Sequence, residues 1–416
     1  MLTASERRTL ALNAPIDDTL SPAVRAVVSA ARGIIQEQAD RLALLFGAQL
    51  LNAPDDRCLE AIIKPVGDSC NLRCRYCFNR PEQPVMRMSE ELLERIVSQV
   101  IELSPAKAGF CFHGGEPLLA GIDFYRLAVA LQAKYRKPGQ EICNSVQSNG
   151  TLLNREWGRF FADNGFRVGV SIDGPPQVHD ANRVDAAGRG SMARLLDGIA
   201  ALREEGVSVS AIAVVTCPPT VAPGELLRLM TRLGIRKWRA NPCRTPGTIS
   251  CFGQYIEGLF DAWAREDDGV CIAIIGDVMR ALLGYSPETC VLGGSCANFP
   301  GFEPDGTVSP CCEMSLEPRF HFGNILSDDL AYILNSPIAQ AFWSSRADGD
   351  AACGECEWWG YCHGGCTYQR IQADGCPGGV DYLCEAYKDV FARLARKVDA
   401  ALEAAAQPPS PNGERR

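Results

Sequence analysis

The sequence predicts an α/β fold: a partial (β/α)6 TIM-like barrel followed by a small, irregular, cysteine-rich α+β domain. Between residues 58 and 267, short apolar runs alternate six times with segments of helical period. After about residue 285 the alternation ends, and cysteine, glycine and tryptophan become dense. Repeated β/α units favour a parallel sheet, whose functional loops follow the carboxyl ends of the strands.

Each unit of the barrel pairs one apolar run with one helix-like segment. The expected strands are 61–66, 109–113, 142–148, 166–172, 207–216 and 236–241. The expected helices are 89–103, 122–135, 155–164, 191–205, 223–233 and 252–266. Ser89 is a suitable N-cap for the first of these helices, and Gly206 and Gly234 are suitable helix stops.

Three segments lie outside the barrel. Residues 1–57 are expected to form an N-terminal helical element, with an amphipathic helix over about 22–51. Residues 285–395 are expected to form the second, metal-stapled domain, in which helix returns only near 381–403. Residues 404–416 contain an alanine run and Pro-Pro-Ser-Pro-Asn-Gly, and they are expected to be a disordered tail.

Composition limits the classes of function. The formal net charge of −9 argues against nucleic acid as the main partner. There is no apolar run of membrane-spanning length and no signal peptide, so the expected location is cytoplasmic, with no membrane partner. In a reducing compartment, the 20 cysteines indicate metal ligands more than disulfides.

Three cysteines follow the first expected strand in the pattern C-x3-C-x2-C: Cys70, Cys74 and Cys77. An iron–sulfur cube normally takes four cysteine ligands, and the next cysteine, Cys111, lies beyond an expected helix. One iron would therefore remain open for a substrate or cofactor. The alternative is a zinc knuckle or a set of unrelated buried thiols.

At this loop the chain resembles the radical S-adenosylmethionine (SAM) superfamily. The resemblance implies a 4Fe–4S cluster whose open iron chelates the amino and carboxylate groups of SAM. Electron transfer from the reduced cluster then breaks the sulfonium and gives a 5'-deoxyadenosyl radical. An electron donor such as flavodoxin or ferredoxin is also implied.

A second motif follows the second expected strand, in His113-Gly-Gly-Glu-Pro117. It is similar to the Gly-Gly-Glu-Pro motif of the superfamily, which implies that Gly114, Gly115 and Glu116 hold the amino group of SAM. The alternative is a β-turn before a helix.

Polar clusters also end the third and fourth expected strands, and they resemble the SAM-binding segments of the sulfatase-maturase branch. By this resemblance Ser148, Ser171 and Asp173 would contact SAM, and Arg183 would pair with its carboxylate, to which a guanidinium is suited. Turn chemistry or capping is the alternative for each. Tyr76 and Phe78 flank Cys77, and they would cover the adenine or shield the cluster.

Eight further cysteines are similar in spacing, together with Gly306, to the SPASM domain of radical SAM enzymes. The resemblance implies two fully ligated auxiliary 4Fe–4S clusters. One would be held by Cys290, Cys296, Cys311 and Cys366, and the other by Cys353, Cys356, Cys362 and Cys384. Full ligation leaves no iron open, so these clusters would carry electrons or staple the domain. A zinc ribbon is the alternative.

Cys312 directly follows one of these predicted ligands, and Glu313 comes next. In anaerobic sulfatase maturases the residue after this ligand is an Asp that acts as a general base. A thiol in its place could relay a proton or an electron, donate a hydrogen atom, replace Cys311 as a ligand, or be inert. The cysteines without a predicted role are expected to be mostly small buried apolar residues: Cys58, Cys111, Cys143, Cys217, Cys243, Cys251, Cys271 and Cys376.

The resemblance covers residues 58–395 and implies hydrogen abstraction from an unactivated carbon. The expected function is therefore an oxidative modification or crosslink in a ribosomal precursor peptide or protein. The alternatives are an anaerobic sulfatase maturase forming formylglycine, a small-molecule dehydrogenase or epimerase, and a non-catalytic iron–sulfur electron-transfer protein.

Overall fold

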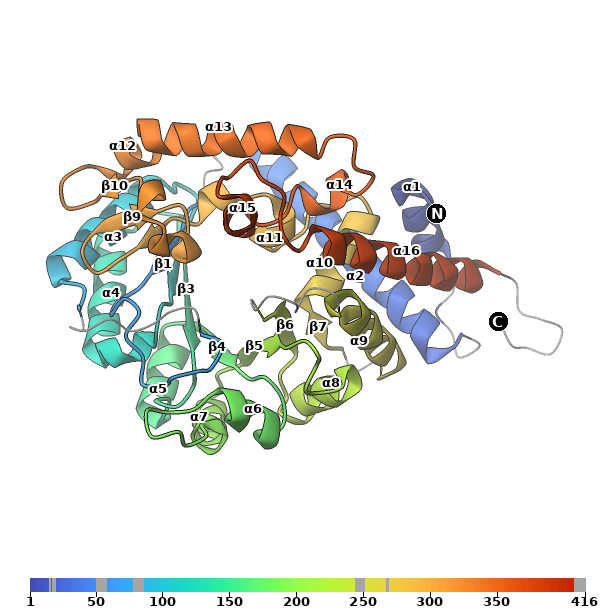
Figure 1. Ribbon diagram of the computed structural model, residues 1–416, viewed down its shortest axis with the longest axis horizontal. Helices are drawn as coiled ribbons and strands as arrows, with labels where there is room; N and C mark the ends of the chain where they lie inside the picture. The colour runs from blue at the N-terminus through green and yellow to red at the C-terminus, as the bar shows by residue number, and fades with distance from the viewer. Residues whose placement is uncertain are drawn as a thin grey trace.

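The computed structural model describes residues 1–14, 16, 20–49, 58–77, 86–243, 251–266 and 269–407 (Figure 1). Its centre is one curved sheet with the strand order β10-β9-β8-β1-β2-β3-β4-β5-β6-β7. The six barrel strands are β1 (Glu60–Ile63), β2 (Lys107–Phe112), β3 (Glu141–Ser148), β4 (Arg167–Ser171), β5 (Val209–Val215) and β6 (Lys237–Pro242). They pair in parallel. Within the described residues β1 does not pair with β6 or β7, so the barrel is partial, as expected.

The outer helices of the barrel are α3 (Glu90–Glu102), α4 (Ile122–Tyr135), α5 (Arg155–Asp163), α7 (Met192–Glu204), α8 (Pro223–Arg232) and α9 (Phe252–Glu266). Each lies within two residues of its expected bounds, because its apolar positions recur with the helical period. Ser89 caps α3 as expected, and its side chain accepts a hydrogen bond from the backbone N–H of Leu92. Short helices η1 (Pro117–Ala120) and α6 (Pro176–Asn182) follow β2 and β4.

The two faces of the barrel strands differ in chemistry. Residues that face the outer helices are large and buried, among them Phe110, Phe112, Val168 and Trp238. Alternate residues face the interior, and in β2 to β5 these are small or polar: Cys111, Ser145, Gln147, Gly169 and Ser210. Closed barrels usually fill this space with bulky aliphatic side chains. Here the small residues leave a cavity.

The C-terminal region continues the same sheet. The strands β8 (Gly301–Phe302), β9 (Thr307–Ser309) and β10 (Gly323–Asn324) extend it beyond β1, with β8 parallel to β1. At the other edge β7 (Cys271–Ile272) pairs with β6. The barrel and the cysteine-rich region therefore share one hydrogen-bonded sheet, although the sequence pattern suggested a simple boundary.

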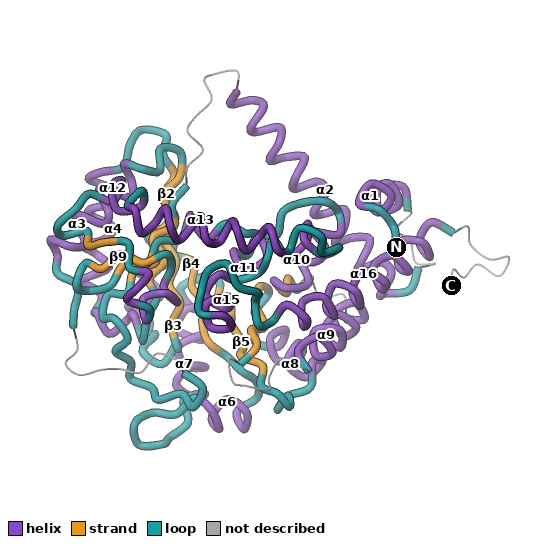
Figure 2. The backbone as a smooth tube through the Cα atoms, turned by 45° about the horizontal axis from the view of Figure 1, so that its top comes forward, coloured by secondary structure: helices purple, strands orange, loops and turns teal. Residues whose placement is uncertain are grey.

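The C-terminal region also contains more helix than expected. Its helical segments are α10 (Ala273–Leu282), α11 (Cys290–Gly293), η2 (Cys296–Asn298), η3 (Cys312–Leu316), η4 (Pro318–Phe320), α12 (Leu330–Leu334), α13 (Pro337–Ala352), α14 (Trp359–Cys362), α15 (Thr367–Asp374) and α16 (Cys384–Ala406). Figure 2 shows α13 running from the side of α12 toward α11 and α10. The expectation that helix returns only near residue 381 is wrong. Many of these helices have only three to five residues, too few to show a helical period, and the 16-residue α13 was missed.

Two N-terminal helices, α1 (Ala4–Asn13) and α2 (Pro22–Gln49), pack with α9 and α16 beside the barrel (Figure 1). The buried side chain of Arg7 pairs with Asp399 of α16, with 2.6 Å between Nε and Oδ1. Contrary to the predicted tail from residue 404, α16 continues to Ala406, and residues 408–416 lie outside the described residues. None of the described helices is long and apolar enough to cross a membrane.

Candidate functional site

The cysteine loop 70–77 is held by backbone pairing with the end of α6 and the segment that follows it. The N–H of Arg73 donates to the carbonyl of Val184 at 2.6 Å, and the N–H of Arg75 donates to the carbonyl of Asn182 at 2.9 Å. Cys70 and Cys74 are half-buried and Cys77 is exposed. The structure therefore gathers the three predicted ligands in one short loop beyond the carboxyl end of β1.

The end of β3 also fixes this loop. Asn149 donates from Nδ2 to Oδ1 of Asn71 at 2.8 Å, and Asn71 donates to the hydroxyl of Thr151 at 2.9 Å. The sulfur of Cys70 receives the N–H of Leu72 at 3.4 Å and the amide of Asn149 at 3.7 Å. Such donors stabilise a thiolate and tune a cluster that it ligates. The role of Asn149 is one that the sequence did not reveal.

Gly114 and Gly115 make room for the backbone that leads into the cysteine loop. A Cβ at Gly114 would lie 2.5 Å from the carbonyl oxygen of Gly67, and a Cβ at Gly115 would lie 2.1 Å from that of Ser69. Any larger residue would displace the loop. The two glycines thus have a packing role in addition to the predicted contact with SAM.

Glu116 is fully buried between the ends of β2 and β3. Its carboxylate accepts hydrogen bonds from the hydroxyl of Ser148 at 2.8 Å and from the N–H of Asn149 at 2.7 Å. Burial raises the pKa of Glu116 to about 7, although these hydrogen bonds oppose the shift. A cationic or N–H-bearing ligand would favour the ionised form, which fits the predicted role toward an amino group.

Arg183 and Asp173 form a buried ion pair with each other. Nε of Arg183 lies 2.9 Å from Oδ2 of Asp173, and Nη2 lies 3.1 Å from Oδ1. The hydroxyl of Tyr76 also donates to Asp173, and the guanidinium lies 5.4 Å from the centre of the Tyr76 ring. Burial would raise the pKa of Asp173, but the charge and hydrogen bonds of Arg183 outweigh it, so this pKa lies below its ordinary value.

This pairing limits how Arg183 can meet a ligand. Asp173 occupies Nε and Nη2, so among the described residues Nη1 is the guanidinium nitrogen left without a protein acceptor. Ser171 lies nearby, and its hydroxyl receives the amide of Gln147 at 3.4 Å. Phe78, the remaining predicted neighbour of the cluster, lies outside the described residues.

A buried lysine joins the SAM side of the site to the C-terminal region. Nζ of Lys64 lies 2.8 Å from each of Asp68, Glu303 and Ser315. Asp68 precedes the cysteine loop, Glu303 follows β8, and Ser315 lies in η3. The signal in the sequence is a lysine inside the apolar run Ala61-Ile-Ile-Lys-Pro-Val66, because a charged side chain in a buried strand needs a partner.

Cys312 begins η3, where its carbonyl oxygen accepts the hydroxyl of Ser315 at 2.9 Å. Gly301 of β8 passes directly beneath, since a Cβ there would lie 2.9 Å from the backbone nitrogen of Cys312. Burial raises the pKa of the Cys312 thiol, and the adjacent Glu313 raises it further. The predicted catalytic residues thus lie at the junction of the barrel and the C-terminal region, beside the Lys64 network.

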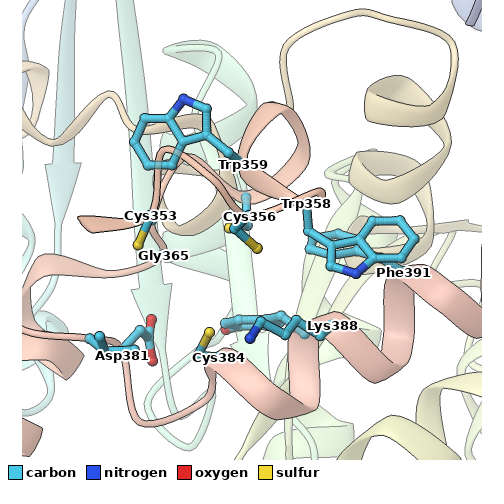
Figure 3. Close-up of a pocket in the computed structure, with 13 residues that line it drawn as sticks. Cys353, Cys356, Trp358, Trp359, Gly365, Asp381, Cys384, Lys388 and Phe391 are labelled. Carbon is cyan, nitrogen blue, oxygen red and sulfur yellow. The ribbon is translucent and has the colours of Figure 1, made fainter. Parts of the chain in front are cut away.

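Four of the C-terminal cysteines surround one cavity: Cys353, Cys356, Cys362 and Cys384. Figure 3 shows the sulfur atoms of Cys353, Cys356 and Cys384 turned toward the same space. Trp358 packs against Phe391 at 5.7 Å between ring centres and borders the cavity, which fits a shielding role. Cysteine thiolates are ligands of both zinc and iron–sulfur clusters, and the iron–sulfur assignment at this cavity remains a prediction.

The other four predicted auxiliary ligands are half-buried: Cys290, Cys296, Cys311 and Cys366. Burial raises the pKa of Cys311, and the neighbouring thiols of Cys312, Cys366 and Cys296 raise it further. Burial and the nearby Cys296 raise the pKa of Cys290 to about 11. Thiols that resist ionisation in this way become thiolates when iron replaces their protons. The donor set therefore fits a cluster, and the division of the eight cysteines into two ligand sets stays a prediction.

The remaining cysteines differ from expectation. Of the eight without a predicted role, only Cys243 is classed as buried, while Cys271 and Cys376 are exposed. The structure also joins the sulfur atoms of Cys217 and Cys251, which lie after β5 and before α9. Sequence spacing carried no signal for this long-range pair.

Comparisons with known proteins agree with the site. The family model described as the radical SAM superfamily matches residues 65–232, and the SPASM model, an iron–sulfur cluster-binding domain, matches residues 298–357. The chain is 31% identical to a cysteine-type anaerobic sulfatase-maturating enzyme of Clostridium novyi, over 82% of this chain and 96% of that protein. It is also 31% identical to a serine-type enzyme of Bacteroides thetaiotaomicron, over 83% and 92%.

Solved structures give the same relationship. The structure of the native enzyme anSMEcpe with bound AdoMet, which is SAM, superposes on this chain with a TM-score of 0.74 at 27% identity. The match covers 83% of this chain and 99% of that one. The same enzyme with AdoMet and the Kp18Cys peptide matches with an equal TM-score of 0.74.

Proposed function

Because the chain belongs to the anaerobic sulfatase-maturase-like branch of the radical SAM superfamily, we propose that it oxidatively modifies or crosslinks a ribosomal peptide or protein. It is a radical SAM oxidoreductase whose cofactors are SAM, a 4Fe–4S cluster with an open iron, and two auxiliary 4Fe–4S clusters. When bound and reduced, the first cluster and SAM supply hydrogen abstraction from carbon. Flavodoxin or ferredoxin is the proposed source of the electron.

The observation behind this proposal is the cavity inside the barrel, whose wall contains residues that also contact the SAM side and the C-terminal region. Gln147 lines the cavity and donates to Ser171, a predicted SAM contact. Arg239 lines it and also borders a smaller pocket with Val291 and Leu292, which follow the predicted auxiliary ligand Cys290. We therefore place the substrate carbon in this cavity, between hydrogen abstraction on one side and electron removal on the other.

Each predicted site residue has a proposed role. Cys70, Cys74 and Cys77 hold the open cluster, and the carboxylate of Glu116 receives the amino group of SAM. Arg183, fixed by Asp173, offers its remaining guanidinium nitrogen to the SAM carboxylate. Ser148 and Ser171 orient the rest of the cofactor, and Tyr76 shields the cluster. The eight C-terminal cysteines hold the auxiliary clusters.

A second candidate is formylglycine formation on a sulfatase, because the relatives named above are sulfatase-maturating enzymes. The residue at the position of the maturase base is Cys312 here, followed by Glu313. A thiol is a better hydrogen-atom donor than a carboxylate, and because it is mostly protonated at neutral pH it is less available as a general base. We therefore rank formylglycine formation below a peptide crosslink or another peptide oxidation.

The test uses anaerobically reconstituted protein with dithionite, SAM and synthetic peptides. One set carries the Cys or Ser of a sulfatase active-site segment, and the other comes from small reading frames beside the gene. We expect 5'-deoxyadenosine and loss of two hydrogens from a peptide of the second set, read by mass spectrometry. A formylglycine product that depends on Cys312 would reverse the ranking.

Two variants make the experiment specific. Cys312→Ala should remove peptide product if the thiol takes part, whereas Cys376→Ala, at an exposed cysteine outside the site, should not. Protein with full iron content that forms no 5'-deoxyadenosine would refute the radical mechanism itself.

A further inference from the structure

The cavity inside the barrel has a volume of about 980 Å³, and its wall mixes apolar and polar side chains. It extends from the interior faces of β2 to β6 to the turns after α5, α7 and α8, where Gly165, Gly206 and Gly234 line it. These turns lie at the amino ends of the strands. The cavity therefore opens at the end of the barrel opposite the cysteine loop.

The charge of this opening contrasts with the charge of the chain. The described residues that line the cavity include five cationic side chains, Arg167, Arg203, Arg236, Lys237 and Arg239, and one carboxylate, Glu60. The whole chain has a formal net charge of −9. A cleft lined by one sign of charge focuses its field and attracts the opposite charge.

The positions of these cations follow from the fold. Lys237 and Arg239 are alternate residues of β6, so both side chains face the interior. Arg167 begins β4, and Arg203 comes from the last turn of α7. Nη2 of Arg203 would lie 2.9 Å from a Cβ at Gly234, so this glycine lets the arginine lie against the turn that precedes β6.

Acidic neighbours only partly balance this charge. Glu288 approaches Lys237 at 4.0 Å, which is a long and exposed ion pair. Asp277 is buried near Arg239, but it accepts hydrogen bonds from the N–H of Glu288 and the hydroxyl of Thr289. Among the described residues, the five cations at this opening outnumber the carboxylates Glu60, Glu288 and Asp277.

We propose that the basic opening of the barrel selects an acidic peptide segment and guides it from the amino ends of the strands toward Cys312 and SAM. This inference rests on the proposed function, which places a peptide carbon in the same cavity. It adds the substrate class: a chain with Asp or Glu residues near the modified position. Electrostatic guidance of this kind acts mainly on affinity and association rate, and salt weakens it.

The experiment measures binding without catalysis. Fluorescein-labelled peptides of alternating Asp and Gly, or of alternating Lys and Gly, are titrated with reconstituted, SAM-loaded protein at low and high salt. We expect the acidic peptide to bind at least about tenfold more tightly at low salt, and salt to reduce the difference.

Charge reversal at the opening then tests the site. The double substitution of Arg203→Glu and Lys237→Glu should weaken binding of the acidic peptide by about tenfold. Arg396→Glu, on the exposed face of α16 outside the cavity, should change binding by less than about twofold. Circular dichroism and iron content monitor folding, and the Gln pair R203Q/K237Q, with a smaller loss expected, replaces the Glu pair if that pair misfolds.

Two results would overturn the proposal: equal affinity for both peptides, or equal losses in the cavity and Arg396 variants. Displacement of the acidic peptide by inorganic phosphate at equal molar concentration would also overturn it in favour of a small-anion site. The proposed function is judged separately, by 5'-deoxyadenosine and peptide product in the native protein. Either idea can therefore fail alone.

Discussion

The molecule presents two cysteine sites built in opposite ways. The loop with Cys70, Cys74 and Cys77 offers three thiols, and the barrel supplies the remaining polar contacts through Glu116 and the Arg183–Asp173 pair. The C-terminal region offers eight thiols, predicted to act in two sets of four, and many of them lie at the ends of short helices. Four of them surround a cavity bordered by aromatic rings. Reactivity depends on the incomplete set, whereas closed sets carry electrons or hold the structure.

The largest expected effect of a substitution is in the loop with Cys70, Cys74 and Cys77. Cys74→Ala should abolish SAM cleavage, because two thiolates cannot hold the cluster in the loop. Iron content should fall by roughly four atoms per chain, as measured by colorimetric assay alongside 5'-deoxyadenosine. Cys271→Ala, at an exposed cysteine, is the control, and a comparable loss in that variant would show that the assay reports general damage.

Substitution of a C-terminal cysteine, whose cluster is predicted to be fully ligated, should have a different effect. Cys384→Ala removes a predicted ligand at the first residue of α16, a helix that packs on α1, α2 and α9. We expect peptide product to disappear and the melting temperature to fall, while SAM cleavage without peptide remains detectable. Loss of SAM cleavage as complete as in Cys74→Ala would contradict the separation of the two sites.

Local patterns in the sequence predicted much of the barrel and of its SAM-binding side. The six β/α units follow from apolar period and helix caps, and the motif order places Glu116, Ser148 and Asp173 at neighbouring strand ends. These features depend on residues a few positions apart, and such patterns can be recognised without a structure.

The features that could not be predicted depend on distant pairs. The bidentate contact of Arg183 with Asp173 competes with the role assigned to each residue alone. The pairing of β8 with β1 and the bridge from Lys64 to Glu303 join segments more than 200 positions apart, and no local period records them. The basic opening likewise gathers cations from β4, α7 and β6.

The link between the two cysteine sites can be tested at Lys64, the bridge between them. Lys64→Met should lower the free energy of unfolding by about 3 kcal/mol, because it leaves the carboxylates of Asp68 and Glu303 without their cation. Lys107→Met breaks an exposed pair with Glu141 on the adjacent strand and should cost at most about 0.5 kcal/mol. Chemical denaturation of the cluster-free proteins gives both values, and equal losses would remove the special role of the buried bridge.

The smallest expected effect concerns the geometry of one ion pair in the open site. Arg183→Lys keeps the charge but cannot hold Asp173 through two nitrogens while offering a third to SAM. We expect SAM to bind about tenfold more weakly, the equivalent of one charge-assisted hydrogen bond. Arg194→Lys, at an exposed guanidinium 3.5 Å from the buried carboxylate of Asp185, should leave SAM affinity unchanged. Anaerobic calorimetry with SAM separates the two, and an unchanged affinity in Arg183→Lys would mean that Arg183 fixes Asp173 and Tyr76 without contacting the cofactor.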